Sequence, residues 1–285
     1  MNQWSGLRGR TKASTASLTV AVLGLVLSPA PIFAQWIDTP TPGVPLKADG
    51  SPDLGAPAPR TAAGKPDLSG IWFSIEFVPE CSAAECIPQG VGLPLDATNI
   101  GRTLPDGLPY QPWAAALVAT RTANLAQDDP HAHCLPPNFP RAFSFPQYFK
   151  ILTTPQVTVI LHEFNATYRQ IFTDGRALPV DPNPYWQGYS SGRWDGDTLV
   201  VETIGFRDDL WLDLSGSPLT SAAHVTERFK RVDYGHLQIE LTVNDPKAYT
   251  RPWTVTLTKS IVLDTDLVEE ICLENEQDTR LFDAK

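Results

Sequence analysis

The C-terminal half of the chain alternates short hydrophobic stretches with turn residues at regular spacing. From residue 147 onward, runs rich in Val, Ile, Thr, Tyr and Phe are separated by Gly, Pro, Asp and Asn. This pattern is typical of the short β-strands of an all-β domain. The predicted strands span residues 148–153, 156–164, 167–173, 188–194, 197–204, 224–232, 236–243, 252–260 and 266–273.

Turn chemistry joins several of these strands into hairpins. Asp195-Gly196 separates Gly192-Arg-Trp from Asp197-Thr-Leu-Val-Val, and an Asp-Gly pair favours a tight type I′ turn. Asp174-Gly175 and Asp233-Tyr-Gly occupy similar junctions. Consecutive hairpins predict an antiparallel meander, and a long meander tends to close on itself. We therefore expect a mainly β domain that closes into a barrel, without tandem repeats or coiled-coil heptads.

The N-terminal half lacks this regular alternation of hydrophobic stretches and turn residues. Residues 35–65 are rich in Pro, Ala, Gly and Thr without a hydrophobic period, which predicts a flexible, extended leader. The barrel-like domain is expected over residues 66–285. One short helix is predicted near residues 112–125, because Pro112 suits the first helical position and the following residues are mostly good helix formers. Residues 79–110 are dense in Gly and Pro and are expected to wrap the surface, and the proline-rich stretch 135–146 is expected to end the helical segment.

The first 34 residues have the features of a secretory signal peptide. Arg8, Arg10 and Lys12 precede an apolar run from Leu18 to Leu27, and small residues follow it. The apolar run is too short for a spanning helix, which needs about 20 residues. We expect cleavage after Ala34, with Ala30 as the alternative, and a periplasmic or secreted protein without membrane insertion after cleavage.

Charge and length narrow the classes of partner. The chain has 285 residues and a formal net charge of −10, and removal of a basic leader would make it more acidic. An acidic protein repels nucleic acid and anionic lipid surfaces, so neither is an expected partner. The remaining length suits one large β domain. The expected partner is a small-molecule ligand or substrate, and the sequence leaves the oligomeric state open.

The four cysteines are expected to pair if the protein is exported. Cys81 and Cys86 are close enough in sequence for a local bridge, and Cys134 and Cys272 would then close a long loop. Four cysteines allow three connectivities, and the sequence does not choose between them. His131-Ala-His133-Cys134 offers an alternative metal site, but its spacing does not suit a structural zinc site. We expect neither a metal ion nor a cofactor.

Two resemblances bear on the fold. Gly70-Ile71-Trp72, at the start of the ordered domain, resembles the Gly-X-Trp that opens lipocalins and related calycin barrels, and it implies a barrel of that kind. A broader resemblance to a large, uncharacterised family of exported bacterial proteins implies export and a shared fold, and no activity. The segments that carry it are Pro66-Asp-Leu-Ser-Gly-Ile-Trp, Pro109-Tyr-Gln-Pro-Trp, Tyr168-Arg-Gln-Ile-Phe-Thr-Asp-Gly-Arg, Gly192-Arg-Trp-Asp-Gly-Asp-Thr-Leu-Val-Val-Glu-Thr, His224-Val-Thr-Glu-Arg-Phe and Asp245-Pro-Lys-Ala-Tyr-Thr-Arg-Pro-Trp.

Single charges fall on otherwise apolar strand faces. Side chains two apart on a strand share a face. By this rule Arg169 lies with Ile171, Glu227 lies with Phe229, and Glu163 and Glu202 also share apolar faces. Because a buried charge must be paired or bound to a polar ligand, we hypothesise that Glu163, Arg169, Glu202 and Glu227 surround a partly polar cavity inside the barrel. The alternative is structural Arg–Glu pairing, or charges at the rim.

Further candidates lie at strand ends. His224 begins a strand and could shuttle protons, with Glu227 and Glu202 as acid–base groups and Arg228 as an anion-holding group. The aromatic and basic residues after the Asp245-Pro246 turn, namely Tyr249, Arg251 and Trp253, could line the mouth of the barrel, although Trp253 also suits the core. Each of these residues could instead have a structural role, as a solvated, hydrogen-bonded or core side chain.

Three function classes remain. The leading hypothesis is a binding protein that holds a small molecule in a partly polar cavity. The alternative is a cofactor-independent hydrolase, lyase or isomerase with Glu or His as acid and base and Arg stabilising an anion. The third is a structural envelope-associated protein. Standard nucleophile, phosphate-loop, dinucleotide and zinc-protease motifs are absent from the sequence, so it does not decide whether the protein is an enzyme.

Overall fold

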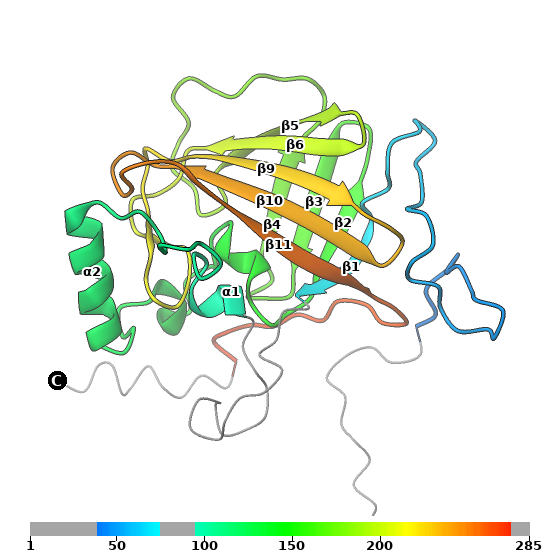
Figure 1. The fold of residues 1–285 in the computed structure, drawn as a ribbon, viewed down its shortest axis with the longest axis horizontal. Helices are drawn as coiled ribbons and strands as arrows, with labels where there is room; N and C mark the ends of the chain where they lie inside the picture. The colour runs from blue at the N-terminus through cyan, green and yellow to red at the C-terminus, as the bar shows by residue number, and fades with distance from the viewer. Residues whose placement is uncertain (1–38, 75–94, 275–285) are drawn as a thin grey trace, which may run out of the picture. The chain divides into compact units, whose positions relative to one another are not determined.

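The computed structural model describes residues 39–74 and 95–274, and its centre is a closed β-barrel of nine strands within these residues (Figure 1). The barrel strands are β1 (Gly70–Ser74), β2 (Phe149–Thr153), β3 (Val157–His162), β4 (Tyr168–Phe172), β5 (Tyr189–Asp195), β6 (Thr198–Ile204), β9 (His224–Arg231), β10 (His236–Asn244) and β11 (Trp253–Val262). A separate small hairpin pairs β7 (Leu210–Trp211) with β8 (Pro218–Leu219). The predicted mainly β barrel is confirmed.

The strands follow one another around the barrel, and β1 closes it by pairing with both β2 and β11. The pairs are antiparallel except for β4 and β5, which run parallel and share two residue pairs, Ile171 with Ser190 and Phe172 with Ser191. A purely antiparallel meander was predicted, and the difference lies in the crossover of residues 173–188. This crossover returns the chain to the end of the barrel at which β4 begins, so β5 runs parallel to β4. A tight turn would have made the two strands antiparallel.

The Asp195-Gly196 hairpin forms as its sequence predicts. Asp195 pairs with Thr198 across the turn, and Gly196 has a φ of +58°, which a glycine adopts without steric cost. The predicted strand over 266–273 is wrong. That segment runs along the barrel as irregular backbone with one bridge, between Glu270 and Phe164, because the barrel is already closed by β1.

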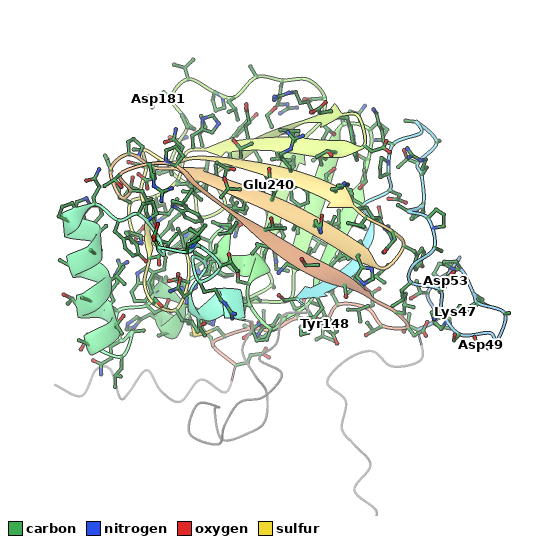
Figure 2. All side chains as sticks on the ribbon, viewed as in Figure 1. Lys47, Asp49, Asp53, Tyr148, Asp181 and Glu240 are labelled. Atoms are coloured by element: carbon green, nitrogen blue, oxygen red, sulfur yellow. A yellow bond between two sulfur atoms is a disulfide. The ribbon has the colours of Figure 1, made fainter. Side chains whose placement is uncertain are left out.

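The leader forms two hairpin turns that repeat in sequence and in hydrogen bonding. Pro45 to Leu54 and Pro59 to Leu68 share Pro, Ala, Gly, Pro, Asp and Leu at equivalent positions. In each copy the Asp amide donates to the first proline carbonyl, with an N···O distance of 2.8 Å for both Asp53 and Asp67. The expectation that tandem repeats are absent is therefore wrong, and residues 39–66 contain hydrogen-bonded turns where an extended leader was predicted. Figure 2 shows Lys47 and Asp49 at the far end of the first copy.

A buried plug segment, residues 137–145, enters the barrel. Its central turn is η2 (Arg141–Phe143), and every residue of the segment is buried. The Phe143 ring contacts Phe149 of β2 and Phe229 of β9, and its carbonyl accepts a hydrogen bond from Lys259 of β11. Because these partners come from opposite parts of the wall, the plug fills the middle of the barrel.

The two α-helices of the described residues lie outside the wall. The predicted helix is α2 (Pro112–Ala123), seen at the left of Figure 1, and α1 (Leu95–Thr98) is a single turn. A short η1 (Pro130–His133) leads into Cys134, which is bonded to Cys272 with a Cα–Cα distance of 5.3 Å. The bridge ties the C-terminal segment to the start of the plug.

Some predictions concern residues outside the described ranges. The signal peptide over residues 1–34 and the local bridge between Cys81 and Cys86 both fall there. Within the described ranges, no helix is both long and apolar enough to cross a membrane.

Candidate functional site

A fully buried ion pair joins β4 to β9 inside the barrel. Arg169 of β4 and Glu227 of β9 are 1% and 0% exposed. Two guanidinium nitrogens of Arg169 donate to the two carboxylate oxygens of Glu227, with 3.0 Å between Nη1 and Oε1. This two-point geometry is the strongest form of Arg–carboxylate contact. Burial raises the pKa of the Glu227 carboxyl, and the Arg169 charge opposes that rise.

Neighbouring hydroxyls satisfy the rest of the guanidinium. Arg169 donates from Nε to Ser190 Oγ at 3.1 Å and from Nη2 to Thr203 Oγ1 at 2.9 Å. The Phe139 ring of the plug lies 3.6 Å from the guanidinium carbon, a cation–π contact. The pair therefore links β4, β5, β6, β9 and the plug in one network. Its geometry is that of a fixed structural unit rather than a free acid or base.

A neutral histidine lies on the same interior wall. His162 of β3 is 5% exposed and packs against Phe143 and Phe149. Burial, with the nearby charges of Arg169 and Lys259, lowers its pKa to about 3. Lys259 donates to Ser74 Oγ at 3.0 Å and to the Phe143 carbonyl at 2.7 Å. The interior of the barrel thus holds several polar groups, each packed or hydrogen-bonded within the described structure.

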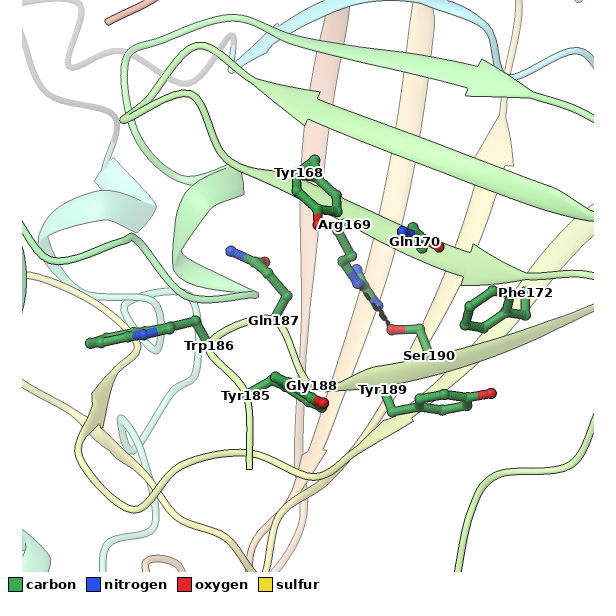
Figure 3. Close-up of a pocket in the computed structure, with 10 residues that line it drawn as sticks. All are labelled: Tyr168, Arg169, Gln170, Phe172, Tyr185, Trp186, Gln187, Gly188, Tyr189 and Ser190. Atoms are coloured by element: carbon green, nitrogen blue, oxygen red, sulfur yellow. Dashed lines mark hydrogen bonds between the residues drawn. The ribbon is translucent and has the colours of Figure 1, made fainter. Parts of the chain in front are cut away.

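A slot large enough for a small ligand lies in the wall between β4 and β5. Only Ile171 and Phe172 of β4 pair with β5, so the residues of β4 before Ile171 have no partner on β5. The end of the crossover, residues 185–188, lines the slot on this side. The slot has a volume of about 440 Å³. Its floor includes Arg169 and Ser190, so it reaches down to the buried ion pair (Figure 3).

Aromatic side chains dominate the slot walls. Two come from β4, two from the end of the crossover and one from the first residue of β5. Figure 3 shows Gln187 on one side of the Arg169–Ser190 contact and Phe172 on the other. The aromatic wall residues are Tyr168, Phe172, Tyr185, Trp186 and Tyr189.

Glycines let the crossover end approach the wall closely. Gly188 has a φ of +63°, and a Cβ added there would lie 2.7 Å from the Thr203 side chain. The amide of Tyr185 donates to the Gly205 carbonyl at 2.9 Å, and Gly205 also has a positive φ, of +77°. These contacts hold Tyr185 and Gly188, which line the slot, against β6 and the residue that follows it.

One lining residue carries an unsatisfied acceptor. Gln187 Nε2 donates to the Pro137 carbonyl of the plug at 2.7 Å, which fixes the orientation of the amide. Its Oε1 is buried and has no hydrogen-bond partner in the described structure. A buried acceptor without a partner costs about 1–3 kcal/mol.

The structure brings two of the four hypothesised cavity residues together. Arg169 and Glu227 meet in the interior, as strand alternation predicts. Glu163 lies at the end of β3, where its carboxylate accepts from the amides of Tyr148 and Val268, each at 3.0 Å. Glu202 is on the outer face, with 3.8 Å to Arg193. The hypothesis of one cavity surrounded by all four is therefore wrong.

The other candidates lie away from the slot. His224 and Arg251 are exposed, and Arg228 is on the outer face beside Asp195. Tyr249 is buried and donates to the Pro218 carbonyl at 2.8 Å, and Trp253 packs against it in the core at a ring distance of 5.5 Å. The expected aromatic mouth of the barrel is thus a packed cluster.

Sequence reasoning identified Arg169 but missed the aromatic walls. The signal was the density of rings in Pro184-Tyr-Trp-Gln-Gly-Tyr and Tyr168-Arg-Gln-Ile-Phe. The His131-Ala-His133-Cys134 run does not form a metal site either, since Cys134 is in the disulfide and His131 packs on Phe164. In the described part of the chain, no group of three or more His, Cys, Asp or Glu side chains is arranged to hold a metal ion.

We compared the chain with protein-family models, with curated proteins and with solved structures, and none of these comparisons found a match.

Proposed function

We propose that this protein binds a small molecule in the slot between β4 and β5. The observation that carries the proposal is the slot itself, of about 440 Å³ with five aromatic walls and a polar floor at Arg169 and Ser190. Ligand sites typically combine a concave, mostly apolar surface of this size with a few fixed polar groups.

Gln187 gives independent support. Its buried Oε1 lacks a partner in the described structure, and the residue lines the slot. A ligand that donates a hydrogen bond to this amide, after a small shift of the side chain, would remove the cost of the unsatisfied acceptor. A bound ligand would thus give this acceptor the partner that it lacks in the described structure.

The geometry gives less support to catalysis at the residues first considered. Both oxygens of Glu227 are held by Arg169, and the carboxylate is fully buried. His224 is exposed at the start of β9, apart from the lining residues of the slot. A group that must exchange protons with a substrate needs access and freedom to do so.

Native mass spectrometry of the protein recovered from its own host tests the binding proposal. We expect an additional mass that disappears on denaturation. Tyr185→Ala, which removes a slot wall, should lose this mass, whereas Trp113→Ala on α2 should retain it. The two side chains are comparably exposed, at 52% and 47%, so the second variant controls for loss of a surface aromatic. Retention of the mass by Tyr185→Ala would contradict binding in the slot.

We also propose that the protein is exported. The basic start, the short apolar run and the small residue at Ala34 support this, and so does the Cys134–Cys272 bridge. N-terminal sequencing of the protein from a periplasmic extract tests it. We expect the mature chain to begin at Gln35, and an intact Met1 in the recovered protein would contradict cleavage.

A further inference from the structure

The slot offers flat apolar faces to whatever enters it. Rings from β4 and from the crossover end stand around the opening, and two of them, Tyr168 and Tyr185, are more than half exposed at 61% and 52%. Aromatic faces favour stacked or edge-to-face contact with another ring. A planar ring system can therefore use more of this surface than a flexible chain can.

The charges around the slot are already matched in pairs. Among the lining residues, Arg169 carries the one ionised side chain, and Glu227 neutralises it. Beside the slot, Arg176 lies over the Phe172 ring at 3.9 Å. Its Nε is 3.0 Å from both carboxylate oxygens of Asp174, so this cation is paired as well.

Because the guanidinium groups at the slot are already paired, the charge of a ligand should affect its affinity. An ion that enters the slot loses its hydration, and recovers that cost only if an unmatched opposite charge is present. Each guanidinium here already has its own carboxylate. An ionic ligand would therefore compete with Glu227 or Asp174 for a partner that is already bound.

From this geometry we propose that the slot selects uncharged, planar aromatic compounds and discriminates against their anionic and cationic analogues. The inference rests on the binding function proposed above and adds the chemical class of the ligand. The ring stacks against the aromatic walls, and polar substituents on it meet the hydroxyl and amide groups of Ser190 and Gln187.

Three matched probes test the inference by isothermal titration calorimetry at one ionic strength. They are 2-naphthol, 2-naphthalenesulfonate and 2-naphthyltrimethylammonium, which share a ring and differ in charge at pH 7. We expect 2-naphthol to bind about tenfold more tightly than either ion. Trp186→Ala should weaken its binding severalfold, and Trp113→Ala should not.

The outcomes separate the inference from the binding function. Binding of either ion as tightly as 2-naphthol would overturn the inference and leave a binding slot in place. No binding by any of the probes, in a protein that also carries no co-purifying molecule, would contradict the slot as a ligand site and the inference with it.

A pair of charge variants sharpens the test. Asp174→Asn leaves Arg176 without its carboxylate beside the slot, so the affinity for 2-naphthalenesulfonate relative to 2-naphthol should rise about threefold. Asp181→Asn removes the same charge from the same crossover, at the exposed position labelled in Figure 2, and should leave the ratio unchanged. Equal ratios in the two variants would contradict the role of matched charge.

Discussion

Two adjacent charged residues of β9 lie on opposite faces of the barrel wall and differ in burial. Glu227 points inward and is fully buried against Arg169, whereas the Arg228 side chain points outward and is 42% exposed. The outer residue is 3.3 Å from Asp195 and 4.0 Å from Glu240, which Figure 2 labels on the outer surface of β10.

The difference shows how burial changes the contribution of an ion pair to stability. On the outer face water screens each charge, so either partner can be lost at little cost. On the inner face no water replaces a missing partner, and the remaining charge stays buried without a counter-charge. Two Arg–carboxylate pairs, formed by adjacent residues of one strand, therefore differ in their effect on the free energy of unfolding.

Removing the inner carboxylate should have the largest effect. Glu227→Ala leaves the Arg169 guanidinium buried without a counter-charge, so we expect the free energy of unfolding to fall by about 3–5 kcal/mol. Urea unfolding followed by tryptophan fluorescence measures it. A loss below about 1 kcal/mol would show that water reaches the pair and that the two faces are alike.

Acid should destabilise the protein through the inner histidine. The folded-state pKa of His162 is about 3, below its unfolded value of 6.5. Between these values the unfolded chain binds the extra proton, so stability is full above pH 6.5 and is lost as the pH falls toward 3. We expect this group to contribute a loss of about 2–3 kcal/mol by pH 4.5.

The control for this prediction is a histidine of the outer face. His162→Gln should flatten the dependence of stability on pH, measured by urea unfolding from pH 7 to pH 4.5. His224→Gln removes an exposed histidine and should leave the slope as it is. Equal slopes in the two variants would mean that other groups cause the acid sensitivity.

Replacing both inner charges at once should cost less than removing one. In Arg169→Met/Glu227→Leu no charge is stranded, and buried ion pairs are often replaced by apolar side chains with little loss. We expect the double variant to be more stable than Glu227→Ala by at least about 2 kcal/mol. A double variant as unstable as the single one would assign the loss to shape, through Ser190 and Thr203, rather than to charge.

The smallest effect is expected on the outer face. Arg228→Ala should change the free energy of unfolding by less than about 0.5 kcal/mol, because both of its contacts are exposed. The same urea titration measures the change. A loss approaching that of Glu227→Ala would remove the contrast between the faces.

Much of the barrel could be predicted from local sequence. Strand alternation placed Arg169 and Glu227 on the interior face, and Asp195-Gly196 located a hairpin, because both signals depend on neighbouring residues alone. Alternation worked less well on β6, where Leu199, Val200 and Val201 are all buried. There the apolar neighbours of Glu202 did not distinguish the inner face from the outer one.

The slot could not be predicted because it depends on pairing over a distance. Nothing local in Tyr168-Arg-Gln-Ile-Phe indicates that β4 pairs with a parallel β5 after a crossover. The plug was missed for a related reason, since its prolines are typical of surface loops. Its burial comes from partners on β2, β4, β9 and β11, which only the closed barrel brings together.

The position of β1 has a consequence for how this chain is made. β1 precedes the other barrel strands in the sequence, yet one of its two neighbours is β11, which ends at Val262. On the ribosome the ring of strands cannot be completed until nearly all of the chain has emerged. If the protein is exported as proposed above, its translocation can therefore begin before the last barrel strand has been synthesised.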